Sequence, residues 1–505
     1  MMARILELPL IVILCLIAAL AMLVPAVHAV SVGDYVTMRA FFYSAVILAI
    51  LSAFVGIASQ GLTVRRQARS HLITLLATYT LVPVLLAVPL REAIGNTTFL
   101  NAYFEMVSSL TTTGATVFDD PSRLRPSIHL WRAVVGWMGG FLAWVTAISI
   151  MAPLNLGGFE VLSSAEAGQG ATAGPISRVA DASERLARYA GRLAPIYGGL
   201  TLVLWIALLV LGDSAFVALC HAMGTMATSG ISPVGGLQGG GSGFMGEAMV
   251  AMFLIFAISR LTFTNDSANM GTKALQSDPE FRLGLAIVIG VPLLLFARHW
   301  LGALDLEEQQ DFRAGLKALW GGIFMVMSFL TTAGFESVDW EEARRWSGLQ
   351  TPGLMLLGLS IFGGGVATTA GGVKLLRVYA LYRHGQRELD KLVHPNSVGG
   401  SGQSARRMRR QGAYVAWIFF MLFAMSIALV MMLLSTLHID FQDSSVLAIA
   451  ALSNTGPLAK FAADVPISYA ALPVLAKLVL AGTMVLGRLE MLVIIALLNP
   501  AFWRQ

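Results

Sequence analysis

The chain alternates between long apolar stretches and short polar connections. A membrane-spanning helix needs about 20 mostly apolar residues, because the hydrocarbon layer is about 30 Å thick and the helix rises about 1.5 Å per residue. Segments that meet this requirement are 5–28, 38–60, 70–91, 128–152, 194–212, 245–263, 282–302, 350–383, 410–437 and 468–498. The eighth and the tenth are longer than one membrane thickness, so we expect them to be tilted, broken or extended beyond the bilayer.

The first apolar segment admits two interpretations. Residues 26–29 imitate a signal-peptide cleavage site, but the apolar stretch is longer than the usual signal core of about 7–15 residues. We therefore interpret 5–28 as a retained first helix, with a cleaved signal peptide as the alternative.

The distribution of basic residues predicts the orientation. If both termini are cytoplasmic, most of the 34 lysines and arginines fall in inside segments, and the long outside segment 213–244 has none. The segment 384–411 combines a Gly/Ser stretch with four arginines near its end. We interpret it as a flexible cytoplasmic linker, whose arginines either anchor the membrane orientation or dock a cytoplasmic partner.

One loop pattern occurs four times. Small hydroxylated or amide residues lead into a single glycine in the segments 109–116, 226–233, 329–336 and 451–458. A short amphipathic run precedes each copy, at 99–110, 214–226, 314–329 and 442–452. Each copy lies on the outer side between two apolar segments, so the pattern predicts four repeats of helix, pore loop and helix.

Four such loops around one axis predict a cation pathway. Non-helical backbone at membrane depth is tolerated where it is buried in protein or lines a water-filled cavity. A ring of backbone carbonyls can replace the water shell of a monovalent cation, and glycine adopts the dihedral angles that aim carbonyls at one axis. The candidate ion-binding residues are Thr112, Thr113, Gly114, Thr228, Ser229, Gly230, Thr332, Ala333, Gly334, Asn454, Thr455 and Gly456.

Composition supports a membrane protein and argues against an enzyme. Hydrophobic residues make up 56% of the chain and charged residues only 12%, about half the charge of a soluble protein. The net charge of +5 is too small an excess to indicate nucleic-acid binding. The eight histidines are scattered and the two cysteines lie in apolar stretches, so we expect no catalytic cluster and no bound cofactor.

The eighth apolar segment contains five glycines between residues 363 and 373. Each glycine costs a helix about 1 kcal/mol relative to alanine, so we expect a break within the membrane that serves as a gate below the filter. Close helix packing through small residues is the alternative. The candidate gate residues are Gly363, Gly364, Gly365, Gly371, Gly372, Lys374 and Arg488.

Charged residues inside the membrane are functional candidates. Arg488 either forms an electrostatic barrier in the pathway or pairs with a carboxylate such as Glu490. Lys374 and Arg377 are expected to snorkel towards the cytoplasmic surface. We expect Glu105 to brace the filter loops by accepting hydrogen bonds.

Three segments resemble the Trk/Ktr/HKT superfamily of potassium transporters, most closely its bacterial TrkH branch. Residues 104–116 are similar to its first pore helix and filter, 363–374 to the glycine-rich segment of its third repeat, and 487–490 to a motif of its last helix. The resemblance implies an all-α membrane protein of about ten transmembrane helices: an N-terminal pair plus four fused repeats around one pore. It also implies potassium uptake across the bacterial inner membrane, a homodimer, and a TrkA-like cytoplasmic subunit that binds nucleotides.

On this basis we divide the chain into a helix pair and four repeats. The predicted boundaries are 1–66, 67–155, 156–265, 266–392 and 393–505. The second and fourth loops depart from the family pattern at Ser229, at Ile231 and after Pro457, which leaves the degree of selectivity open. Less selective sodium and potassium translocation, and cation-coupled symport, remain the alternatives.

Overall fold

A computed structural model gives the fold of the chain. It describes residues 9–59, 67–153, 156–161, 182–259, 278–303, 312–347, 352–394, 412–463, 465–491 and 494. Within these ranges every regular element is helical. The expected all-α architecture is therefore confirmed.

A pair of helices precedes four repeats. The pair is α2 (Leu10–Val32) and α3 (Tyr35–Ala58). The first repeat consists of α4 (Gln67–Ile94), α5 (Phe99–Leu110) and α6 (Pro126–Thr146), and the second of α8 (Ala182–Val210), α9 (Ala215–Met226) and α10 (Gly243–Leu254). The third consists of α12 (Pro279–Ala303), α13 (Phe312–Leu330), α14 (Trp340–Ser347), α15 (Pro352–Phe362) and α16 (Leu375–Val393), and the fourth of α18 (Gly412–Ser435), α19 (Phe441–Leu452), α20 (Leu458–Phe461) and α21 (Val474–Leu489). Helix α6 continues into a π-helical turn at Ala147–Met151, and α10 into a 3-10 turn at Ile255–Ala257. The second helix of each repeat (α5, α9, α13 and α19) leads into one of the four loops.

Eight helices in the described part of the chain are long and apolar enough to cross a membrane. Three expected spans are shorter than the sequence suggested. Within the described residues, helix ends at 257 in the segment 245–263, begins only at 474 in the segment 468–498, and is interrupted at 363–374 in the segment 350–383. Proline explains the late start of α21, since Pro473 occupies its N-cap. The third pore helix, in contrast, is long enough to be counted among the eight.

Apart from α13, the pore helices are short, and their C-terminal halves are largely buried. The side chains of Thr98 and Ser214 cap α5 and α9 by accepting hydrogen bonds from Asn101 N and Val217 N. Residues 104–110 of α5 and 446–452 of α19 are all buried. A helix that is buried on every side must be surrounded by protein, so these helices form the centre of the molecule.

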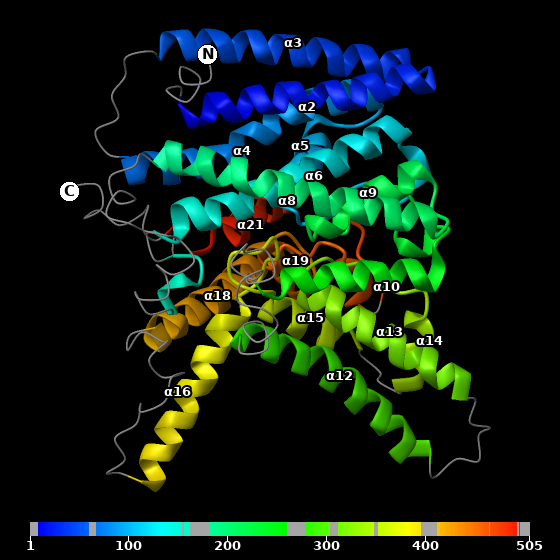
Figure 1. Cartoon of the computed structure of the whole chain (residues 1–505), viewed down its shortest axis with the longest axis vertical. Coiled ribbons are helices and arrows are strands. Elements are labelled where there is room, and N and C mark those ends of the chain that lie inside the picture. The colour runs from blue at the N-terminus through cyan, green and yellow to red at the C-terminus, as the bar shows by residue number, and fades with distance from the viewer. Residues whose placement is uncertain are drawn as a thin grey trace.

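The N-terminal helix pair packs against the outside of the first repeat (Figure 1), and α3 lies at one end of the long axis. The fully buried rings of Phe41 and Trp131 meet edge to face at 5.3 Å between centroids. The carboxylate of Asp34, in the turn between α2 and α3, pairs with Arg125 at 2.6 Å. The pair therefore lies apart from the four loops, as expected.

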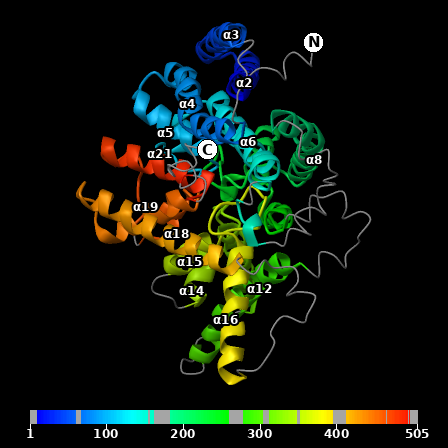
Figure 2. The same ribbon diagram turned by 90° about the vertical axis from the view of Figure 1, so that its left-hand side faces the viewer.

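The third repeat contains the break that the glycines predict. Helix α15 ends at Phe362, α16 begins at Leu375, and the connecting residues 363–374 are not helical. Helix α16 then extends away from the body of the molecule towards one side and α12 towards the other (Figure 1), and both lie at the lower end of the view in Figure 2. Helix α16 continues to Val393 and carries exposed ion pairs such as Lys391–Glu388 at 2.7 Å. The prediction of a flexible linker from residue 384 is therefore wrong for residues 384–393, and residues 395–411 lie outside the described ranges.

Candidate functional site: four loops and an intramembrane segment

All four pore helices end with the same backbone turn. The N–H of the residue just before the loop glycine donates to the carbonyl five residues earlier, at 2.8–2.9 Å. These bonds are Thr113 N to Ser108 O, Ser229 N to Gly224 O, Ala333 N to Ser328 O, and Thr455 N to Ala450 O. This is the six-to-one bond of a Schellman motif. Four loops of different sequence thus share one geometry.

The same turn places a left-handed residue two positions before each glycine. Thr112, Thr228, Thr332 and Asn454 have φ angles of 56°, 50°, 58° and 54°. This conformation is uncommon for residues other than glycine and is an outlier for a β-branched threonine. Strained residues of this kind cost about 1–3 kcal/mol each and cluster at functional sites. The fourfold repetition of the strain makes these loops the candidate functional centre.

The loop glycines close the four loops into a ring. An added Cβ on Gly114 would overlap the Ser229 carbonyl of the second loop, and one on Gly230 would overlap the Ala333 carbonyl of the third. A Cβ on Gly334 would lie 2.8 Å from Pro457, in the fourth loop. Each loop therefore contacts the next one in chain order.

The contact between the fourth and first loops completes the ring. A Cβ on Gly456 would overlap the backbone of Ala115, and Gly456 N donates to Thr113 O at 2.6 Å. The sequence predicted four loops on one side of the membrane, and the structure joins them through their glycines.

The fourth loop differs from the other three. Gly114, Gly230 and Gly334 have positive φ, whereas Gly456 does not. The carbonyl of Gly456 accepts a hydrogen bond from the Tyr469 hydroxyl at 2.9 Å. The four pore helices therefore end in the same way, but the carbonyls of the four loop glycines do not all have the same environment.

Carboxylates brace the first and third loops. Glu105 accepts hydrogen bonds from Val117 N at 3.1 Å and from the Thr116 hydroxyl at 3.2 Å, and it pairs with Arg132 at 2.6 Å. The expected bracing role of Glu105 is thus confirmed. In the third loop the carboxylate comes from another repeat, because Glu247 of α10 accepts from the Ser337 hydroxyl at 2.9 Å.

A histidine braces the second loop. His221 of α9 contacts the Ser232 hydroxyl at 2.9 Å through Nε2 and Asp213 at 3.4 Å through Nδ1. Burial alone would raise the pKa of Asp213, but hydrogen bonds from His221 and Ser242 outweigh burial and hold the pKa below its usual value. Ser232 also accepts from Val234 N at 3.2 Å, so these residues hold the loop together rather than forming a catalytic triad.

The glycine-rich segment 363–374 lies directly against the pore loops. Its Thr369 hydroxyl donates to Met226 O at 3.2 Å, at the end of α9, and Gly371 N donates to the Thr332 hydroxyl at 2.7 Å. A Cβ on Gly371 would overlap the Ser453 carbonyl of the fourth loop. The segment therefore touches three of the four loops, where an occluding element would lie.

Charged side chains of the last helix and of the segment itself hold this segment in place. Arg488 Nη1 donates to Thr369 O at 2.8 Å, and Lys374 Nζ donates to Ala370 O. The carboxylate of Glu490 pairs with Arg377 at 2.7 Å, so the proposed Arg488–Glu490 pair is not the one that forms.

The expected snorkelling of Lys374 and Arg377 is wrong. Their exposed fractions are 8% and 0%, because hydrogen bonds and the ion pair compensate their burial. The guanidinium of Arg377 also lies 3.7 Å from the centroid of the Phe419 ring.

We expect Glu490→Ala to destabilise the protein by about 3 kcal/mol, because it leaves the Arg377 cation buried without its partner. Thermal unfolding of the purified protein in detergent measures this loss. Glu388→Ala is the matched control, since Glu388 forms an ion pair on the exposed part of α16 and its removal should leave the melting temperature unchanged. Equal melting temperatures for Glu490→Ala and the unmodified chain would contradict the structural importance of the buried pair.

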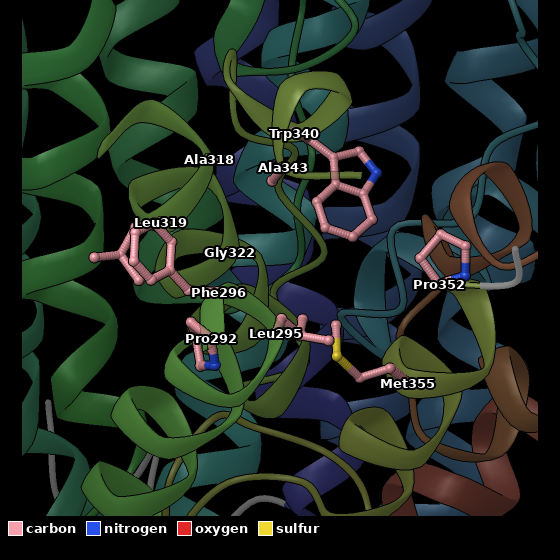
Figure 3. Close-up of a pocket in the computed structure, with 10 residues that line it drawn as sticks. All are labelled: Pro292, Leu295, Phe296, Ala318, Leu319, Gly322, Trp340, Ala343, Pro352 and Met355. Carbon is pink, nitrogen blue, oxygen red and sulfur yellow. The ribbon is translucent and has the colours of Figure 1, made fainter. Parts of the chain in front are cut away.

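Two pockets differ in their lining. One is apolar and lies between α12, α13, α14 and α15, where Pro292, Phe296, Trp340 and Met355 surround it (Figure 3). It contains none of the candidate site residues. The other lies below the pore loops, and its lining includes Gly371, Lys374 and Arg488 as well as Tyr79. This second pocket, which has charged side chains in its lining, is the one that belongs to the candidate pathway.

Glu336 and Lys460 form an ion pair beyond the loop glycines, at 3.2 Å between Oε2 and Nζ. Lys460 also lies 4.9 Å from the centroid of the Phe461 ring. The negative charge of Glu336 is therefore balanced by a lysine of α20, which follows the fourth loop.

Sequence reasoning missed the residues that brace the loops. Arg132, Asp213, His221 and Tyr469 follow no shared spacing, because each loop uses a different partner. Glu247 did carry a signal, as it is the lone carboxylate within the apolar segment 245–263. Among the described residues no group of histidine, cysteine, aspartate and glutamate is suited to hold a metal ion.

These features define a class: a polytopic membrane protein in which four helix–loop–helix repeats form one central ring. Comparison with known proteins identifies the family. The model of the TrkH family, described as cation transport proteins, matches residues 37–235 and 310–503. The chain belongs to this family, whose members are transport proteins and not enzymes.

Individual relatives agree with this assignment. The chain is 32% identical to the Trk system potassium uptake protein TrkH of Salmonella typhimurium over 81% of this chain and 80% of the relative. It is 28% identical to TrkG of Escherichia coli over 96% of both. The crystal structure of the potassium transporter TrkH from Vibrio parahaemolyticus superposes over the whole of both chains with a TM-score of 0.82 and 26% identity.

Proposed function

We propose that this chain takes up potassium ions through the ring of four loops, which acts as a selectivity filter, and that residues 363–374 act as the gate. The observation that carries the proposal is the closed ring of strained turns with the glycine-rich segment lying against three of its members. Buried, non-helical backbone at membrane depth suits a cation pathway because its carbonyls can replace water. Potassium is the ion named for the TrkH and TrkG relatives.

The test is cation uptake into liposomes that contain the purified full-length protein. We expect rubidium and potassium to enter well above sodium. Sodium entry equal to that of potassium would support the ion pathway but contradict its selectivity. No uptake of any cation, with or without a cytoplasmic partner, would contradict the proposed function.

One observation favours a less selective pathway as the second candidate. The Gly456 carbonyl already accepts a hydrogen bond from Tyr469, which leaves it less able than a free carbonyl to replace a water of the ion. A filter with fewer available carbonyls would discriminate less between sodium and potassium, and cation-coupled symport is the other alternative. A sodium-to-potassium uptake ratio near one supports the former, and dependence of uptake on a proton or sodium gradient supports the latter.

The proposal includes location and assembly. We place the protein in the bacterial inner membrane with both termini cytoplasmic, divided into repeats at the boundaries given above. We also propose a homodimer and a TrkA-like cytoplasmic subunit that binds nucleotides. The projecting α16 supports a partner on this side, because Leu389, Leu392 and Val393 are more than half exposed there.

A further inference from the structure

The start of the gate segment is held by the second repeat and by the first helix of its own repeat. The N–H of Gly365 donates to the carbonyl of Ala257 at 2.9 Å, and the N–H of Val366 donates to Oε1 of Glu280 at 2.8 Å. Ala257 ends the last helical turn of the second repeat, whereas Glu280 lies in the first turn of α12, which opens the third. Two successive amides of the gate are thus bound by two different elements.

These two elements are also joined to each other. The Ser259 hydroxyl donates to the carboxylate of Asp278, and Glu280 N bonds to the other oxygen of that carboxylate at 3.3 Å. The three side chains are buried, with exposed fractions of 0% for Ser259, 8% for Asp278 and 2% for Glu280. The junction between the second and third repeats therefore forms a small, buried clasp around the start of the gate.

The gate glycines have no space for a side chain where they meet the second repeat. A Cβ on Gly365 would overlap the carbonyl of Ile258, and one on Gly364 would lie 2.5 Å from Ala257 O. The gate backbone lies directly against the end of the second repeat. A shift of this junction must therefore move residues 364–366 or break their hydrogen bonds.

We propose that Glu280 is a positioning residue that latches the gate closed, and that displacement of the junction between the second and third repeats releases it. The inference rests on the proposed gate. A buried N–H without an acceptor is costly, so removal of the acceptor of Val366 N destabilises the closed gate and shifts it towards the open state. A cytoplasmic partner that moves the junction would open the pathway in this way.

The Glu280 carboxylate also acts on the gate through its charge, and the test must separate this effect from the hydrogen bond to Val366 N. Glu280 also interacts electrostatically with Lys374 in the gate. Glu280→Gln removes the charge but keeps an oxygen that can accept the hydrogen bond from Val366 N, whereas Glu280→Ala removes both. The pair of variants therefore distinguishes the latch from the charge.

The experiment uses the full chain in liposomes without a partner protein. We expect Glu280→Ala to raise rubidium uptake about tenfold and Glu280→Gln to remain close to the unmodified chain. Ser259→Ala loosens the clasp at its other end and should raise uptake in the same direction. Because both substitutions disrupt the same hydrogen-bonded clasp, the double variant should raise uptake by less than the product of the two single-variant increases.

A second measurement follows the gate without relying on flux. Thr368 lines the pocket below the loops, so Thr368→Cys reports access to water through its rate of modification by a charged thiol reagent. We expect this rate to rise about tenfold in Glu280→Ala and to stay unchanged in Glu280→Gln. Equal effects of the two variants, or no effect of either, would overturn the latch. If Gly371→Ala changes uptake while Glu280→Ala does not, the gate stands and the latch is wrong; absence of all uptake refutes the proposed function instead.

Discussion

Replacement of Gly114 by serine is expected to remove the preference for potassium over sodium. Gly114 has a φ angle of 72°, which side chains disfavour, and its Cβ would overlap the Ser229 carbonyl of the next loop. That carbonyl belongs to the proposed filter, so the serine must push it away from its position. A loss of 1.4 kcal/mol in relative ion stabilisation already corresponds to a tenfold change. We therefore expect the rubidium-to-sodium uptake ratio to fall by at least about tenfold.

Gly95→Ala is the matched control for this variant. Gly95 ends α4 with a φ angle of 76°, but a Cβ there would meet nothing within 4 Å. It has the same backbone strain without the clash in the ring. Gly95→Ala should keep the uptake ratio of the unmodified protein, and a Gly114→Ser variant that is equally selective would contradict the assignment of the ring as the filter.

The sequence predicted the elements of the pathway because they depend on local chemistry. Helix length, the repeated loop pattern and the cluster of glycines at 363–373 are all properties of neighbouring residues. The break between Phe362 and Leu375 appeared where those glycines weaken the helix. The bracing by Glu105 was predictable because the carboxylate lies in the pore helix beside its own loop.

The contacts between repeats were not predictable in the same way. Glu247 braces a loop about 90 residues later in the chain, and Arg377 pairs with Glu490 across 113 residues. Such pairs depend on how the repeats pack, and no spacing in the sequence encodes them. For the same reason Lys374 and Arg377 were assigned to the surface, although their partners allow both to be buried.

Gly371→Ala is expected to increase uptake and to reduce its dependence on a cytoplasmic partner. The φ angle at Gly371 is not positive, so alanine causes no backbone strain at this position. Its Cβ would, however, overlap the Ser453 carbonyl at the end of α19. The overlap exists only while the segment lies against the loops, because moving the segment away relieves it. The substitution therefore destabilises the closed arrangement selectively and shifts the population towards the open one.

Gly358→Ala provides the comparison within the same repeat. Gly358 lies in α15, five residues before the break, and a Cβ there would meet nothing within 4 Å. Alanine at this position favours the helix without touching the gate, so uptake should remain that of the unmodified chain. Rubidium uptake with and without the partner measures both variants. If Gly371→Ala lowers uptake and leaves its regulation intact, residues 363–374 line the pathway without closing it, because only an occluding segment gains freedom from a clash that exists in the closed state alone.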